Sequence, residues 1–341
     1  MGVIAPPSSG DPLSIAGTLH PDRAIGSLWH RFVAIAADGM IVGIAATLVA
    51  LPFFETLSRL GPWGRLVGFC VALPYFAILN SSIGNGQTVG KRWMHLQVVD
   101  VRGNTIAFGK SLVRYAWLAI PYFLNDMSLP VTRTPWIVSS LIAVMVFGVG
   151  GANLYLVCFN RHTRQGIHDL AVESYVAEAD KSGPLKTTAI WKMHWVILGV
   201  LLIVLSSAGW ILRDEVAKWG AFTRLLDNAR VIESVEGVQQ AGVQDLTSWN
   251  NGKETKILVL DVYWAGKSSG EEAFADRVAQ LILQNDPKVQ EHDLLRIGMI
   301  RGYDLGIAHA HVSHSFEHTP SDWRARLFGT SPTDNSTPTK Q

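Results

Sequence analysis

The sequence predicts an all-α membrane helical bundle with five spans, followed by a small soluble α+β domain. The chain of 341 residues is 48% hydrophobic and only 17% charged, whereas an average soluble domain has about 25% charged residues. Long stretches carry almost no charge. The charges also divide unevenly, because residues 1–212 carry a net +5 and residues 213–341 a net −4. The overall net charge of +1 argues against a nucleic-acid binder.

Four apolar runs are long enough to be spans. Phe32–Phe54 contains one charged residue, Asp38, while Leu66–Ile83 and Trp136–Phe159 contain none. Met193–Leu212 contains only a histidine. A helix needs about 20 apolar residues to cross about 30 Å of hydrocarbon. Buried helices of a large soluble protein are the alternative, and these rarely run so long without charge.

A fifth run, Lys110–Asn125, is shorter and is interrupted by Pro121, so by length alone it could also be interfacial or re-entrant. The basic loops favour a crossing. Gly84–Arg114 and Asn160–Lys192 each hold five Lys or Arg residues, and such short loops stay in the cytoplasm. Both lie inside only if an even number of spans separates them. The N-terminus is then cytoplasmic, everything after Leu212 is outside, and no cleavable signal peptide is evident.

This pattern predicts the following domain order: a disordered segment 1–26, a membrane domain 27–176, a cytoplasmic linker and fifth transmembrane helix 177–212, an extracytoplasmic α+β domain 213–328, and a disordered tail 329–341. Hydrophobic periodicity and capping residues divide the α+β domain further. The expected elements are a helix at Trp219–Arg230, a strand at Lys256–Trp264, a helix at Ser268–Asn285, strands at Leu294–Arg301 and Leu305–Ser313 joined by a turn at Gly302–Asp304, and a helix at Ser321–Phe328.

Asp38 is the most unusual residue of the spans. A carboxylate inside a span costs about 2.5–3.5 kcal/mol, so it needs a partner or a use. Arg31 lies seven residues earlier on the same helical face, about 10.5 Å away along the axis. Gly39 and Gly43 form a G-x-x-x-G step that lets another helix approach closely. Two interpretations stay open: an ion pair with a basic residue of a neighbouring helix, or a titrating site on a cation or proton path.

The loop after the second run carries a compact motif, which consists of Gly86, Gln87, Thr88, Gly90, Lys91 and Arg92. A phosphate-binding loop is excluded, because Asn85 replaces the first glycine and Arg92 the hydroxyl residue that would hold magnesium. Residues 96–106 are expected to form a hairpin with its turn at residues 102–104. Lys110 and Arg114 are expected to lie at anionic lipid headgroups.

The C-terminal domain contains a group of four histidines, His309, His311, His314 and His318. His309 and His311 would share one strand face and could ligate a metal, although the spacing matches no standard zinc pattern. A solvated surface and a pH-sensitive interface are the alternatives. The two cysteines exclude a disulfide scaffold. The sequence shows no catalytic constellation and implies no cofactor.

Several of these residues together resemble the RDD family of bacterial membrane proteins over Ser27–Val176. Arg31 and Asp38 match the family's first Arg and Asp, and Asp169, in the stretch R-Q-G-I-H-D, matches the second Asp. The G-Q-T-V-G-K-R loop resembles the family's signature as well. Glu173-Ser174 departs from the Gly-Thr that is common there. The resemblance implies an integral membrane domain in a bacterial inner membrane, and cation/proton antiport has been proposed for some members.

Two functions are compatible with these observations. The first is an anchor or scaffold for an extracytoplasmic domain, and the second is a cation/proton antiporter that uses Asp38, in which Arg31 and Asp169 are ion-pair candidates. The expected partners are anionic lipid headgroups at the cytoplasmic face and other membrane or envelope proteins. A homo-oligomer is expected for a transporter, because five spans are few for a carrier. Nucleic acid is not an expected partner.

Overall fold

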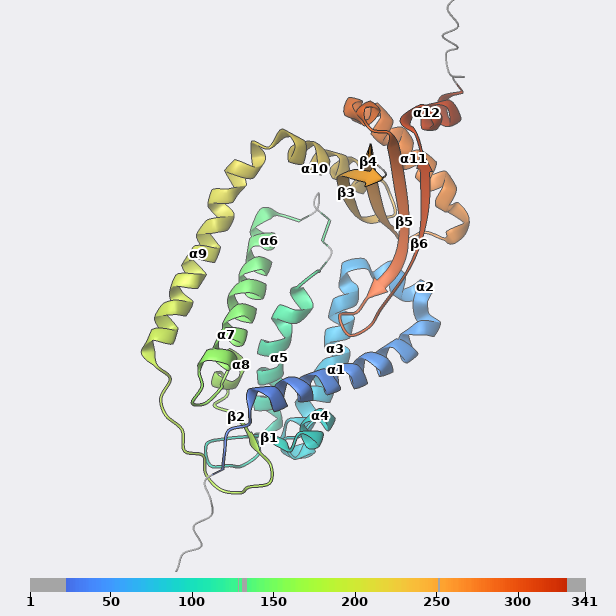
Figure 1. Cartoon of the computed structure of the whole chain (residues 1–341). Coiled ribbons are helices and arrows are strands. Elements are labelled where there is room, and N and C mark those ends of the chain that lie inside the picture. The colour runs from blue at the N-terminus through green and yellow to red at the C-terminus, as the bar shows by residue number, and fades with distance from the viewer. Residues whose placement is uncertain (1–22, 128, 131–133, 251, 330–341) are drawn as a thin grey trace, which may run out of the picture.

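The computed structural model describes residues 23–127, 129–130, 134–250 and 252–329 (Figure 1). The segments expected to be disordered lie mostly outside these ranges. Residues 23–26 are an exception, because Ile25 forms an isolated bridge with Ala177 and Arg23 is buried. The N-terminal region is built from these elements: α1 (Leu28–Ala50), α2 (Phe54–Leu57), α3 (Gly64–Leu79), α4 (Val89–Trp93), β1 (Leu96–Val99), α5 (Phe108–Leu124), α6 (Trp136–Ala143), the π-helical η4 (Val144–Gly150), α7 (Gly151–Phe159), α8 (Ile167–Leu170), β2 (Tyr175–Glu178) and α9 (Lys192–Ala217).

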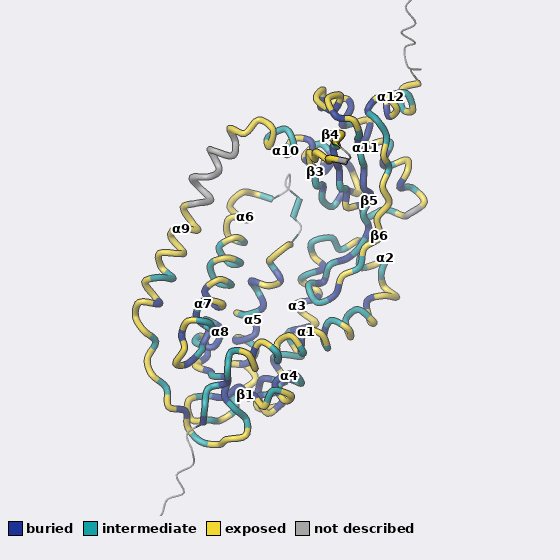
Figure 2. Tube along the Cα trace, in the orientation of Figure 1, coloured by how far each residue is buried: buried dark blue, intermediate teal, exposed yellow. Residues whose placement is uncertain are grey.

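Two helical stretches of the described chain are long and apolar enough to cross a bilayer. They are Leu28–Leu79, which includes α1 and α3, and Trp136–Phe159. Lys192–Ser207 is a shorter apolar helix. The helical path of the first stretch breaks at Gly61, whose φ of 52° lies in the left-handed region. Large apolar side chains are exposed along these helices, and most residues at 192–207 of α9 are exposed (Figure 2).

The short connections at one end of the helices form a second layer. Strand β1 pairs with β2 in antiparallel register, Val98 opposite Val176. The expected hairpin of residues 96–106 is therefore wrong in its pairing, although the turn at residues 102–104 is present and closes with a single bridge between Val99 and Thr105. Strand β2 pairs with all four residues of β1, and Leu96, Val98 and Val176 pack in one cluster.

The C-terminal part contains a four-stranded sheet. Its elements are α10 (Gly220–Glu233), β3 (Val238–Asn250), β4 (Lys253–Trp264), α11 (Glu271–Asn285), β5 (Leu294–Asp304), β6 (His309–His318) and α12 (Pro320–Phe328). The strand order is β3-β4-β5-β6, and only the β4–β5 pair is parallel. Side chains of β4 and β5 such as Leu260 and Ile297 pack with Ile232 of α10, Val278 of α11 and Trp323 of α12. These helices therefore share one face of the sheet.

Two expectations for this part are wrong in detail. No strand is predicted from the sequence over residues 238–250, which form β3. The turn expected at Gly302–Asp304 lies three to four residues further on, at Leu305–Ala308, where Gly306 adopts a φ of 73°. Strands β5 and β6 are therefore longer than expected, and their connected ends extend from the sheet to the helices of the N-terminal region (Figure 1).

Candidate functional site

Asp38 lies inside α1 and is completely buried. Its Oδ1 accepts hydrogen bonds from the hydroxyl of Tyr75 at 3.0 Å and from the backbone N–H of Gly90 at 2.8 Å. Its Oδ2 accepts one from Thr88 Oγ1 at 2.5 Å. Among the described residues, Asp38 makes no ion pair within 4 Å. Neutral donors on α3 and α4 thus take the place of the basic partner that the sequence analysis considered.

Local structure brings these donors to Asp38. Thr88 caps the N-terminus of α4, where its side chain also accepts from the N–H of Lys91. A Cβ on Gly90 would collide with the Ala34 carbonyl of α1. Only glycine therefore lets α4 pack against α1 closely enough for its backbone to reach the carboxylate. Thr88 and Gly90 of the motif therefore supply two of the three hydrogen-bond donors to the Asp38 carboxylate.

Two further residues of the motif, Gly86 and Gln87, hold the loop against β1. Gly86 has a φ of 66°, and a Cβ there would come within 2.5 Å of the Val98 carbonyl oxygen. Gln87 donates from Nε2 to the Leu96 carbonyl at 2.9 Å. Arg92 is exposed.

Arg31 does not face Asp38. Its Nη1 donates to the Arg164 carbonyl at 2.5 Å and its Nη2 to the Val176 carbonyl at 3.0 Å. The buried guanidinium therefore ties α1 to the segment that follows α7 and to β2. The seven-residue separation from Asp38 directs the two side chains to different neighbours.

Asp169, the second family Asp, forms the centre of another buried cluster. Its Oδ1 lies 2.7 Å from Nη2 and 2.8 Å from Nε of Arg114, and it accepts from Ser174 Oγ at 3.1 Å. Burial by itself would raise the pKa of Asp169, but Arg114 and Arg31 outweigh it and hold that pKa below its usual range. Arg114 is thus an interior ion-pair partner, and the expectation that it lies at lipid headgroups is wrong.

His168 is next to this carboxylate, and its ring hydrogen-bonds to no Ser, Thr or Cys side chain of the described residues. Its Nε2 lies 3.3 Å from Asp169 Oδ2, and its Nδ1 lies 2.8 Å from Asn153 Oδ1. Burial lowers the pKa of His168 to about 4, although the negative charge of Asp169 opposes this shift. The ring is therefore neutral at neutral pH and serves as a hydrogen-bonded packing group.

Lys91 is close enough to both buried carboxylates, Asp38 and Asp169, to interact with them electrostatically. Its Nζ donates to Asn80 Oδ1 at 2.8 Å, and the side chain is buried. Burial, together with the positive charges of Arg114 and Arg31, lowers the pKa of Lys91 to about 7, although Asp38 and Asp169 oppose this shift. The sequence motif identified the residue without indicating that its ammonium group is enclosed.

The connection between β5 and β6 is inserted among the helices, which the sequence analysis missed. A Cβ on Gly68 of α3 would collide with the Leu305 carbonyl, and one on Gly64 would lie 2.6 Å from the Asp304 carbonyl oxygen. The hydroxyl of Tyr122 donates to the Gly306 carbonyl at 2.7 Å. On α1, Gly43 faces the Ile307 carbonyl, while Gly39 has open space. The expected close approach at the G-x-x-x-G step is thus made by this hairpin and not by a helix.

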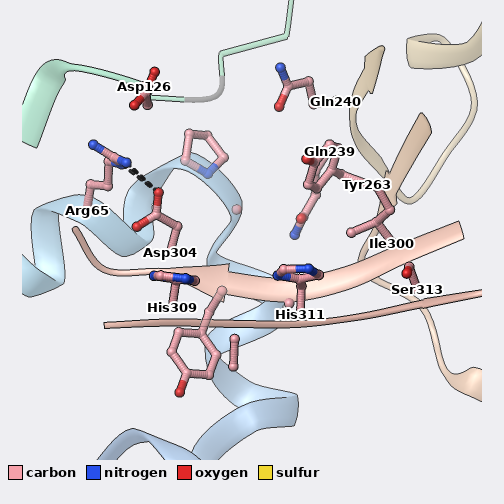
Figure 3. A pocket seen from close by; sticks show the side chains of 15 residues that line it. Arg65, Asp126, Gln239, Gln240, Tyr263, Ile300, Asp304, His309, His311 and Ser313 are labelled. Atoms are coloured by element: carbon pink, nitrogen blue, oxygen red, sulfur yellow. Dashed lines mark hydrogen bonds and ion pairs between the residues drawn. The ribbon is translucent and has the colours of Figure 1, made fainter. Parts of the chain in front are cut away.

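Beside the hairpin, a cavity of about 340 Å³ is lined by residues of both the sheet and the helical region (Figure 3). Arg65 of α3 pairs with Asp304 of β5 at 2.5 Å at its edge. His309 and His311 line this cavity from the same strand face (Figure 3).

The four histidines of β6 do not come together. His314 lies on the helix-covered face, where its Nδ1 is 2.5 Å from Glu271 Oε2 of α11, and His318 packs edge-on against Trp323. The alternation of side chains along a strand separates these two from His309 and His311. Within the described residues, no group of three or more His, Cys, Asp or Glu side chains is arranged to hold a metal ion.

Comparison with known proteins bears on the N-terminal region. The RDD family model matches residues 25–173, a range that contains Arg31, Asp38, Asp169 and the loop motif. No curated protein and no solved structure matches the chain. The C-terminal sheet domain lies beyond the family match. Residues 25–173, which carry both buried carboxylates, are thus similar to the RDD family.

Proposed function

We propose that this chain is a membrane anchor that holds its C-terminal sheet domain in a fixed position at the membrane surface. In this proposal α1, α3, α5, the α6–η4–α7 unit and α9 are the five spans. The β1/β2 end faces the cytoplasm, because the Lys/Arg-rich loops lie there. The sheet domain lies on the opposite side, where it is available to other membrane or envelope proteins.

The inserted β5–β6 hairpin is the observation that carries this proposal. A flexibly tethered domain would need only the α9–α10 connection. Here the sheet domain also buries Tyr303 and Leu305 against Ala50 of α1 and its neighbours. Arg65–Asp304 and the contact of Arg301 with Glu55 of α2, at 3.2 Å, add polar links between the two parts. Such an interface restricts relative motion of domains.

Asp38 has a simple role in this proposal. Its three donors come from α3 and α4, so the carboxylate joins three segments of the bundle. A buried polar group that is fully hydrogen-bonded stabilises one arrangement of the chain, because an unsatisfied donor or acceptor is costly. The anchor would then be rigid from the β1/β2 layer to the hairpin.

A substitution in the hairpin seat tests the anchor. Gly68→Ala places a methyl group against the Leu305 carbonyl, so we expect the hairpin to leave its seat. Hydrogen exchange of the residue 303–310 amides should then become at least tenfold faster in the full-length protein. Gly39→Ala is the matched control, because a Cβ there meets nothing within 4 Å. Unchanged exchange in folded Gly68→Ala protein would contradict the seating role.

The orientation needs a separate measurement. Single cysteines at the exposed positions Arg102 and Glu254, in a chain with Cys70→Ser and Cys158→Ser, can be labelled with a membrane-impermeant maleimide. We expect labelling of Glu254→Cys in intact cells and of Arg102→Cys only after lysis. Labelling of both positions in intact cells would refute the five-span topology.

A transporter is the second candidate, and the enclosed Lys91, which interacts electrostatically with both buried carboxylates, favours it. In this alternative the protein exchanges a cation for a proton at Asp38. Proton flux into reconstituted vesicles would be driven by a cation gradient and abolished in Asp38→Asn. Absence of such flux in the wild-type protein, or flux unchanged in Asp38→Asn, would eliminate this alternative and leave the anchor.

A further inference from the structure

A second cavity, of about 390 Å³, lies where α7 ends and α9 begins. It is separate from both carboxylate clusters. Its walls combine three aromatic side chains with four polar or basic ones, namely Tyr155, Phe159, Trp191, Asn160, Arg161, His162 and His194.

The cavity carries the positive charge of Arg161, which no described residue neutralises. Arg161 and His162 are exposed, and neither side chain makes a hydrogen bond or ion pair with any described residue. No carboxylate is found among the described residues that line the cavity. The cavity beside the β5–β6 hairpin differs in charge, because the carboxylates of Asp126 and Asp304 line it together with basic side chains.

His194 adds a positioned polar group. The side chain is more than nine-tenths buried, and its Nδ1 lies 2.9 Å from the Tyr155 hydroxyl. When this hydroxyl donates to Nδ1, the ring hydrogen lies on Nε2 and is available to an acceptor. The ring of Trp191 packs edge-on against the His194 ring and so holds it in place. A buried imidazole and two exposed basic side chains therefore converge on one cavity.

The surroundings of the cavity are apolar on one side. Phe159 and Trp191 are each 61% exposed, and Trp is enriched at membrane–water boundaries. Beyond them α7 and α9 expose Leu154, Val196 and Val200. A ligand with an anionic head and hydrocarbon tails would match both parts of this surface. Basic pockets between transmembrane helices commonly bind such headgroups.

We propose that this cavity binds the phosphate headgroup of an anionic phospholipid, with Arg161, His162 and His194 as its ligands and the acyl chains along α7 and α9. The inference rests on the membrane embedding of these two helices. It differs from the expectation for Arg114, which is buried in an ion pair, whereas Lys110 is exposed and stays a predicted headgroup contact.

Native mass spectrometry of the full-length protein in detergent tests the site. We expect phosphatidylglycerol to remain bound more than phosphatidylcholine of equal chain length. Each Lys or Arg near an anionic lipid surface contributes about 1 kcal/mol to the binding free energy, which corresponds to a roughly fivefold change in affinity. Arg161→Gln/His162→Gln should therefore weaken phosphatidylglycerol binding at least fivefold, whereas Arg161→Lys should retain it.

Arg102→Gln is the matched control, because Arg102 is an exposed arginine in a turn outside the cavity. Equal binding of the two lipids, or undiminished phosphatidylglycerol binding by the double variant, would overturn the proposal. Displacement of the lipid by an equal concentration of inorganic phosphate would show a free-phosphate site and would also overturn it. These measurements do not depend on topology, so a failure of the orientation test would be distinguishable from a failure of the lipid site.

Discussion

The guanidinium of Arg114 on α5 and the carboxylate of Asp169 on α8 form an ion pair that is almost fully excluded from solvent. Both Nε and Nη2 approach the same oxygen, Oδ1, at 2.8 and 2.7 Å. The pair connects a helix that packs on α3 with the segment that leads to β2. If Arg114 is lost, Asp169 stays buried with its hydrogen bonds to Ser174 and Gly166 but without its ion-pair partner of full charge.

Arg114→Met is therefore expected to lower the free energy of unfolding by about 3–5 kcal/mol, as is typical when one partner of a buried pair is removed. Denaturant unfolding of the detergent-solubilised protein measures this loss. The double variant Arg114→Met/Asp169→Leu should be more stable than Arg114→Met alone, because it removes both charges. If the double variant is less stable than Arg114→Met, the loss in Arg114→Met does not come from the unpaired charge of Asp169.

Thr88→Val removes the donor that lies closest to Asp38. A hydrogen bond to a charged group contributes about 1.5–3 kcal/mol, and the same substitution also removes the cap of α4. We expect a loss of at least 1.5 kcal/mol in unfolding experiments. Thr88→Ser keeps the hydroxyl and should stay within about 1 kcal/mol of the wild type. Equal losses in both variants would assign the effect to packing instead of hydrogen bonding.

Lys91 should make stability depend on pH in the alkaline range. Its pKa is about 7 in the folded protein, below the ordinary 10.5, so the unfolded chain binds more protons between these two values. The free energy of unfolding then rises with pH across this window, by up to about 1.4 kcal/mol per pH unit. Lys91→Met should remove that rise, which unfolding curves at several pH values between 7 and 10 would detect. A wild-type slope that persists in Lys91→Met would have another source.

The two acidic partners of Arg301 should differ in importance. Glu271 is buried and lies 2.7 Å from Nε, whereas the Glu55 side chain is 64% exposed and lies 3.2 Å from Nη1. Glu271→Gln should cost up to about 3–5 kcal/mol, because the buried guanidinium then keeps only the exposed Glu55 as a counter-charge. Glu55→Gln should cost at most about 1 kcal/mol, as for exposed pairs. Differential scanning calorimetry of the two variants measures both, and a reversed order would refute the assignment by burial.

The membrane character of the N-terminal region was predictable because it depends on runs of apolar residues. The positions of Asp38 and Asp169 were also recognisable, since charged residues are conspicuous in such runs and motifs. Their partners were not. Asp38 depends on Gly90, whose missing side chain allows α4 to approach α1, and no charge pattern indicates such a contact.

In the C-terminal part, helices α10, α11 and α12 were predicted with boundaries shifted by a few residues, because amphipathic periodicity is a local property. Strand β3 was missed, since its polar residues alternate with few apolar ones, and its pairing with β4 defines it. The β5–β6 turn was placed too early. Gly302 is compatible with a turn, but here it lies in the strand, facing the backbone of His311.

The sequence alone therefore determined the membrane-type composition, the family motifs and the existence of a second domain, because hydropathy, charge and residue spacing are written along the chain. Only the tertiary structure decided which groups meet. It gave Asp38 neutral donors, paired Arg114 with Asp169, divided the histidines between two faces of the sheet and seated the hairpin against Gly64 and Gly68. These contacts join residues that are far apart in the sequence, and they depend on how closely two backbones approach, which is a property of packing in three dimensions.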